Sequence, residues 1–228
     1  MKYFLPFMML VLTSFFSAFT YSLPNITGST GLITMPTAEI LKYREYNVAI
    51  DYNLNLDSST SSEYYYKFNV GALDNVELGF VGGTNPAEGV FLNLKWNLSS
   101  NTGRFPLLMA IGFENLTSTN ESDFYIVSSK KLRSDLGLHA GFKALFNDEV
   151  EVGFMTGLDY AYSESLLIFS DITNTGNSYY TFNASSLYKL SLGDSTDNIY
   201  LRGSIQNLFR SGDKDTYFNL GICYYNVL

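Results

Sequence analysis

The stretch "LGLHAGFKALF" (136–146) alternates apolar residues with small or polar ones along its whole length. Counted by twos, Leu138 and Phe142 share one face, and His139 and Lys143 share the other. Successive side chains of a strand point to opposite faces, so a period of two indicates a β-strand. The stretch therefore predicts a strand with one apolar and one polar face.

The same alternation recurs from residue 44 to the C-terminus, separated by short clusters of Gly, Asn, Asp and Ser that are typical of turns. No linker or low-complexity tract divides the chain, so we expect one all-β domain, residues 44–228, built from consecutive hairpins. We expect 10 to 12 strands, because about 12 such runs can be counted. They lie near 44–55, 63–73, 75–83, 89–98, 105–116, 122–130, 134–146, 149–162, 164–172, 178–191, 197–209 and 215–228.

Two architectures fit such strands. A secreted soluble β-sandwich that binds a ligand would bury the apolar face between two sheets, whereas a membrane barrel turns that face to lipid. The runs are about 9 to 14 residues long, aromatic residues gather at their ends, and the polar face is rich in Gly. These features favour a single antiparallel, up-and-down transmembrane β-barrel with short turns. The runs "DFYIVSS" (123–129) and "SLLIFSD" (165–171) do not choose a face cleanly.

The N-terminus predicts export. Residues 1–22 combine Lys2, an apolar core and a run of small or polar residues, the layout of a cleaved signal peptide. With a barrel, this predicts the outer membrane of a Gram-negative-type bacterium, with outer-membrane lipid as a partner. The net charge of −8 argues against nucleic-acid binding, and the single Cys223 excludes an internal disulfide framework.

The polar face carries charges of both signs, which either fill a narrow lumen with ion pairs or line a pore for small solutes. We expect no enzyme activity, cofactor or metal, because the only histidine has glycines two residues away on its own face. A lipid-modifying barrel enzyme stays open as an alternative. The residues expected to face the lumen are Asp51, Lys67, Glu77, Lys95, Glu114, His139, Lys143, Glu151, Asp159, Lys189 and Arg202.

One stretch breaks the alternation, "GSTGLITMPTAEIL" (28–41), within a lead-in that spans residues 23–43. Pro36 fixes its own backbone and pushes Met35 toward an extended conformation. Two interpretations remain open. The stretch either folds against the periplasmic mouth or into the lumen as a plug, with Leu32 and Ile33 among its contacts, or is a disordered lead-in.

The same stretch, with the hairpin that follows, resembles the start of YjbH-like outer-membrane barrels, a group linked to bacterial exopolysaccharide production and export. The resemblance covers about the first sixty residues after the signal peptide. It implies a barrel and a role that touches a polysaccharide, and it implies no active residues. The matching positions are Gly31, Leu32, Ile33, Pro36, Thr37 and Ala38, then Gly71, Asp74, Glu77 and Gly79.

Overall fold

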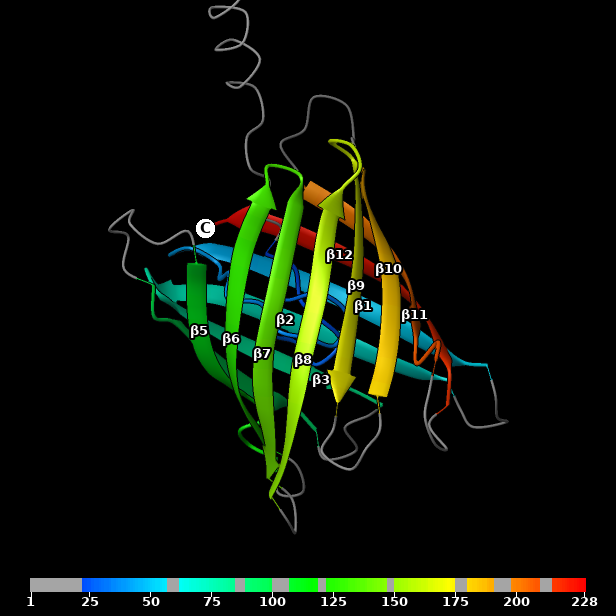
Figure 1. The fold of residues 1–228 in the computed structure, drawn as a ribbon, viewed down its shortest axis with the longest axis horizontal. Coiled ribbons are helices and arrows are strands. Elements are labelled where there is room, and N and C mark those ends of the chain that lie inside the picture. The colour runs from blue at the N-terminus through cyan, green and yellow to red at the C-terminus, as the bar shows by residue number, and fades with distance from the viewer. Residues whose placement is uncertain are drawn as a thin grey trace, which may run out of the picture.

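The chain forms one closed antiparallel barrel of twelve strands (Figure 1). The computed structural model describes residues 22–56, 62–84, 89–99, 107–118, 122–146, 150–174, 180–190, 198–209 and 215–228; the predicted signal peptide lies outside them, apart from Ser22. The strands are β1 Glu45–Asn55, β2 Glu63–Leu73, β3 Val76–Gly83, β4 Phe91–Asn97, β5 Leu107–Glu114, β6 Ser122–Arg133, β7 Leu136–Phe146, β8 Val150–Ala161, β9 Leu166–Asn174, β10 Tyr180–Leu190, β11 Asn198–Gln206 and β12 Tyr217–Val227.

Each strand pairs with its neighbours in sequence, and β1 pairs with β12 to close the sheet. The expected fold class is thereby confirmed, because a closed up-and-down sheet of twelve strands leaves no second layer for a sandwich. The backbone N–H of Leu228 donates to the carbonyl of Arg44, so the C-terminus and the start of β1 lie at the same end. By the convention of outer-membrane barrels this end is periplasmic.

The outer face of the barrel is apolar. Ile50, Phe142 and Ile222 face outward and are 59%, 61% and 52% exposed. A soluble monomer rarely exposes a continuous apolar surface, whereas a barrel in lipid requires one. The outer face is therefore suited to hydrocarbon rather than to water. Among the described residues, no helix is long and apolar enough to cross a membrane.

The structure also explains the two runs that did not choose a face. In β6 and β9 the inward residues Tyr125, Val127, Leu167 and Phe169 are apolar and buried. Several outward residues are apolar as well, namely Phe124, Ile126, Leu166 and Ile168. Strand β6 also runs to Arg133 rather than to the predicted 130. A bulge between Lys131 and Arg133 lets it continue into the two-residue turn before β7.

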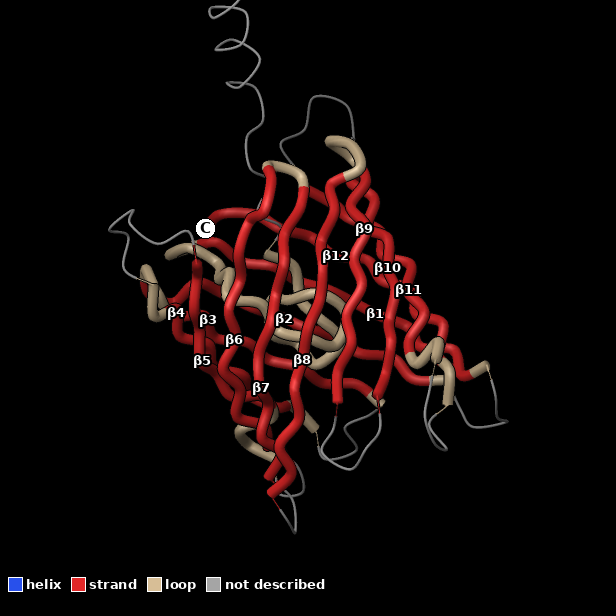
Figure 2. Tube along the Cα trace, in the orientation of Figure 1, coloured by secondary structure: helices blue, strands red, loops and turns tan. Residues whose placement is uncertain are grey.

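We call residues 22–44 the luminal segment: residues 22–41 lie inside the barrel, and the exposed Lys42, Tyr43 and Arg44 lead from it to β1. Figure 2 shows this part of the chain as a loop enclosed by the strands. Its side chains are mostly buried, and Ile33, Met35 and Leu41 are completely so. The segment enters from the periplasmic end, occupies the lumen and returns to that end, where β1 begins.

Candidate functional site

The luminal segment is a compact loop held partly by its own backbone hydrogen bonds. Short bridges join Pro24 to Thr30 and Gly31 to Pro36, and Ile26 N–H donates to the Ile33 carbonyl at 2.8 Å. Gly28 has a φ of 108°, a left-handed conformation that other residues rarely adopt. At Gly31 a Cβ atom would lie 2.9 Å from the Pro36 Cα atom and still closer to the Met35 carbonyl oxygen. Two glycines are thus required for this folding of the segment.

Apolar side chains of the segment pack against the inward apolar residues of the wall. Leu32 and Ile33 join one cluster with Leu167, Phe169 and neighbouring side chains. Met35 joins a second cluster that includes Tyr125. Burying an apolar side chain of this size contributes about 1.5 to 3 kcal/mol. These contacts explain why β6 and β9 carry apolar residues on both faces.

A buried ion cluster anchors the start of the segment. Asp51 on β1 pairs with Lys67 on β2 and accepts two bonds of 2.6 Å from Arg202 on β11. Both cations also donate to the segment, Lys67 to the Asn25 carbonyl at 2.7 Å and Arg202 to the Pro24 carbonyl at 2.5 Å. The cluster joins three strands of the wall to the segment. Each of its three charged side chains is paired with an opposite charge.

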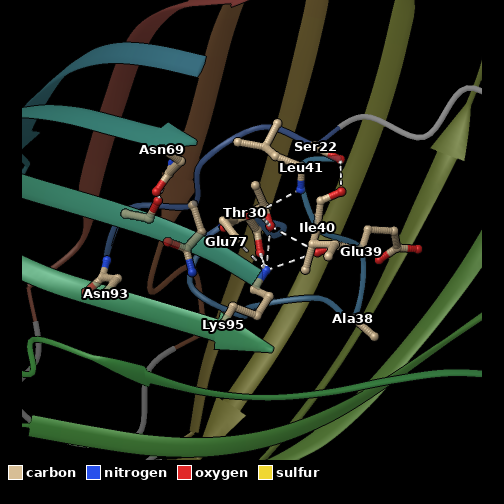
Figure 3. Close-up of polar contacts among 12 residues, drawn as sticks. Ser22, Thr30, Ala38, Glu39, Ile40, Leu41, Asn69, Glu77, Asn93 and Lys95 are labelled. Carbon is tan, nitrogen blue, oxygen red and sulfur yellow. Dashed lines mark hydrogen bonds and ion pairs between the residues drawn. The ribbon is translucent and has the colours of Figure 1, made fainter. Parts of the chain in front are cut away.

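A second anchor lies on β3 and β4 (Figure 3). The Glu77 carboxylate accepts bonds from the backbone N–H of Thr30 and of Leu41, each at 3.0 Å, and from the Thr30 hydroxyl at 2.9 Å. Lys95 donates to the Thr30 carbonyl at 2.5 Å and to the Glu39 carbonyl at 3.1 Å. Its Nζ atom lies 3.9 Å from the Glu77 carboxylate. This pair holds both the middle and the end of the segment.

The third anchor is Asp171 on β9. One oxygen of its carboxylate accepts the backbone N–H groups of Ile33, Thr34 and Met35 at 2.9, 2.8 and 3.2 Å. The other oxygen accepts the Thr34 hydroxyl at 3.1 Å and the Asn183 amide at 2.6 Å. Three successive N–H groups around one oxygen form an anion nest. Sequence reasoning missed Asp171, because it lies in a run whose faces could not be assigned.

Glu114 on β5 forms the anchor nearest the opposite end. It accepts the Thr27 hydroxyl at 2.7 Å and the Asn25 amide at 3.3 Å. Lys143 on β7 lies 3.2 Å from Glu114 and 2.5 Å from Asp123. The segment is thus hydrogen-bonded to side chains on opposite sides of the barrel.

His139 lies between Ser129 and Asp159. Its Nδ1 atom is 2.8 Å from the Ser129 hydroxyl, and its Nε2 atom is 2.7 Å from an Asp159 carboxylate oxygen. Ser129 lies opposite His139 across the β6–β7 hairpin, in a register set by the bulge near Lys131. Counting back from the two-residue turn without that bulge pairs His139 with Lys130. The sequence therefore gave no sign that a serine faces this histidine.

The Ser–His–Asp arrangement resembles that of a hydrolase, but its hydroxyl is closed off. Ser129 is only 1% exposed, and its oxygen accepts the Ala38 N–H of the segment at 2.8 Å. A hollow nearby, lined by His139, Asp159 and Glu39 among others, does not include Ser129 in its lining. The arrangement instead fastens the segment to β6.

The residues expected to face the lumen all occupy inward positions, but they differ in burial. Asp51, Lys67, Glu77, Lys95, Glu114, His139, Asp159 and Arg202 are buried, whereas Lys143, Glu151 and Lys189 are half-buried nearer the barrel ends. Of the resemblance positions in the segment, Leu32, Ile33, Pro36, Thr37 and Ala38 are buried, and Gly31 is half-buried.

Solvent does not reach the middle of the lumen. Asp51 on β1, Asn69 on the adjacent β2 and Asn183 on β10 are each 0% exposed. A barrel of about eight strands is filled by its own side chains, while much wider barrels leave a channel. With twelve strands, this barrel is filled by its own side chains together with the luminal segment.

No family model matches the chain, and no curated protein matches it. Among solved structures, the KdgM porin aligns with a TM-score of 0.56 at 12% identity, covering 78% of this chain and 98% of that one. The NanC porin aligns at 0.52 with 9% identity over 78% and 98%. The COG4313 outer membrane channel from Pseudomonas putida F1 aligns at 0.52 with 12% identity over 86% and 100%. The chain thus has the fold of outer-membrane porins and channels.

Proposed function

We propose that this protein is a narrow, non-enzymatic outer-membrane channel that the luminal segment closes. The single observation that carries the proposal is the complete burial of polar wall residues at mid-depth, Asp51, Asn69 and Asn183. A barrel that is permanently filled does not need polar groups in its interior, because apolar side chains would pack there at least as stably. A wall that is polar and yet covered by a separate stretch of chain fits a passage that opens when that stretch moves.

The solute of this channel is a small polar molecule. The protein itself has a role in exopolysaccharide production or export. The fold shared with porins supports transport, and one of those structures is the KdgM porin in complex with disordered oligogalacturonate. The resemblance of residues 28–41 and of the β2–β3 hairpin to YjbH-like barrels supports the connection to a polysaccharide. The apolar outer face and the predicted signal peptide support the outer membrane as the location.

A second candidate is a permanently closed barrel with a structural role in the envelope. The observation that favours it is the extent of bonding between wall and segment, because Glu77, Lys95 and Asp171 each make several hydrogen bonds to it. Bonds to charged groups contribute about 1.5 to 3 kcal/mol each when partners are buried. Such a segment would never leave the lumen under physiological conditions.

Conductance in planar bilayers separates the two candidates. The wild-type chain, a deletion of residues 28–41 and the full-length Gly31→Val variant are compared after heat-modifiable gel migration has shown that each is folded. A gated channel gives brief openings in the wild type and steady openings in both variants. A structural barrel gives a silent wild type, and a lumen that stays silent in both variants contradicts the channel altogether.

A further inference from the structure

The luminal segment shows what kind of guest the wall of the barrel accepts. Glu77, Glu114 and Asp171 receive only backbone N–H, hydroxyl and amide groups from it. Lys67, Lys95 and Arg202 donate to backbone carbonyl oxygens and to the Thr30 hydroxyl. These six charged wall groups are therefore satisfied by uncharged donors and acceptors of the segment, whose one carboxylate, Glu39, lies 3.9 Å from His139 instead.

The wall neutralises its own cations. Lys67 and Arg202 share Asp51, Lys95 lies near Glu77, and Lys143 contacts Glu114 and Asp123. An anionic guest at this depth would have to compete with a carboxylate for each of these cations.

Asp171 makes the barrier to anions stronger. Its wall partner is the neutral Asn183, and its remaining hydrogen bonds come from the segment. Once the segment leaves, the Asp171 carboxylate faces the lumen without a paired cation among the described contacts. An unneutralised charge in a narrow low-dielectric passage focuses its field on passing ions and repels those of like sign.

The same region offers apolar surface. Leu167 and Phe169 lie on β9, the strand that carries Asp171, and belong to the inner cluster that the segment covers; Tyr200 on β11 belongs to the same cluster. A hydroxyl group is both donor and acceptor, and a saccharide carries hydroxyls around an apolar ring face. From these contacts we infer that the solute is an uncharged saccharide, and that the luminal segment occupies the solute's own site.

This inference rests on the proposed channel function and narrows it to one class of solute. It also distinguishes this chain from the porin whose structure holds oligogalacturonate, since each unit of that saccharide carries a carboxylate. The uncharged backbone of the segment imitates a neutral chain of sugar hydroxyls in the sites at Glu77 and Asp171.

Influx of radiolabelled sugars into proteoliposomes tests the inference. The full-length Gly31→Val variant, with the 28–41 deletion as a second open form, is compared for glucose and for glucuronate, which differ by one carboxylate. We expect glucuronate to enter more slowly by roughly threefold or more, because the Asp171 charge opposes it. Adding Asp171→Asn to the open form should bring the two rates together, whereas Asp135→Asn in the exposed β6–β7 turn should leave their ratio unchanged.

The outcomes distinguish this inference from the function on which it rests. Equal rates, or faster entry of glucuronate, in an open and folded variant would overturn the solute class and leave the channel standing. If neither open form admits glucose although both migrate as folded barrels, the channel itself is wrong. A ratio that Asp135→Asn shifts as much as Asp171→Asn does would also overturn the inference, because it would assign the selectivity to overall charge.

Discussion

The strand wall and the luminal segment are held by different interactions. The wall is a closed ladder in which each strand pairs with both of its neighbours. The segment has six backbone hydrogen bonds within residues 23–37, and side chains of the wall bind much of its remaining backbone. We therefore expect the wall to stand without the segment and the segment to lose its conformation without the wall.

This difference shows how one chain can be rigid and openable at once. A closed sheet leaves no backbone group unpaired in lipid, so the barrel is the minimum that the membrane requires. The segment satisfies the polar groups on the inner face, which lipid never contacts. Its removal exposes those groups to water rather than to hydrocarbon, and this is a far smaller penalty.

The largest expected effect is a variant in which the luminal segment unfolds while the strand wall stays folded. Gly31→Val places a side chain against the Met35 carbonyl and Pro36, so the segment can no longer adopt its folded loop. We expect thermolysin to cut the segment near Leu32 and Leu41 in the folded variant and to leave the wild type intact. The barrel should keep its heat-modifiable migration, and a variant whose barrel is lost along with the segment would contradict the independence of the wall.

A substitution in the ion cluster should weaken both regions together. Asp51→Asn leaves Lys67 and Arg202 buried without their anion, which destabilises the fold by about 3 to 5 kcal/mol. Urea unfolding in lipid vesicles measures the loss. Asp135→Asn is the matched control, since its pair with Arg133 is largely exposed and contributes about 0 to 1 kcal/mol. Equal midpoints for the two variants would show that the cluster does not hold the wall.

Loss of the anion nest should loosen the segment alone. Asp171→Ala removes the acceptor of the Ile33, Thr34 and Met35 amides. We expect the free energy of local opening at these amides to fall by roughly 2 to 3 kcal/mol. Amide hydrogen exchange of these three residues should quicken by about 30- to 150-fold, while amides of β7 keep their rates. Unchanged exchange at all three residues would mean that Asp171 does not anchor the segment.

The smallest effect belongs to Ser129. Ser129→Ala removes the acceptor of the Ala38 N–H and the hydroxyl that contacts His139, at a loss of about 1 to 2 kcal/mol. Thermolysin should cut this variant slightly faster than the wild type and far more slowly than Gly31→Val. A fluorophosphonate probe should fail to label the wild type, and Ser129-dependent labelling would revive the enzyme interpretation.

Much of the wall could be predicted from the sequence, because lipid outside and polar groups inside impose a period of two. The alternation of residues 136–146 placed His139 and Lys143 on one face, and the structure has both facing inward. The prediction weakened at 123–129 and 165–171, where apolar residues lie on the inner face as well as on the outer one. Tyr125 and Phe169 are apolar because they pack against the luminal segment or beside it. The alternation along one strand does not show which of its residues contact a separate stretch of the chain.

The contacts of the site were harder to predict than its residues. Ser129 meets His139 because a one-residue bulge shifts the β6–β7 register, and no residue type marks that bulge. Asp171 meets the amides of residues 33–35 across 136 to 138 positions of sequence. The spacing of residues along a strand predicts which face each side chain occupies. It does not predict which of them a loop crossing the lumen will contact.

Disulfide trapping tests most directly whether the luminal segment occupies the barrel of the protein in a membrane. The Thr34 hydroxyl and the Asn183 amide are 3.0 Å apart, so Thr34→Cys and Asn183→Cys place two thiols within bridging reach. Cys223→Ala removes the native thiol. Mild oxidation in membranes should then join positions 34 and 183 and should fail to join Thr34→Cys with Asp74→Cys in the periplasmic turn. Bridging at the turn with none at position 183 would place the segment outside the lumen and contradict the account.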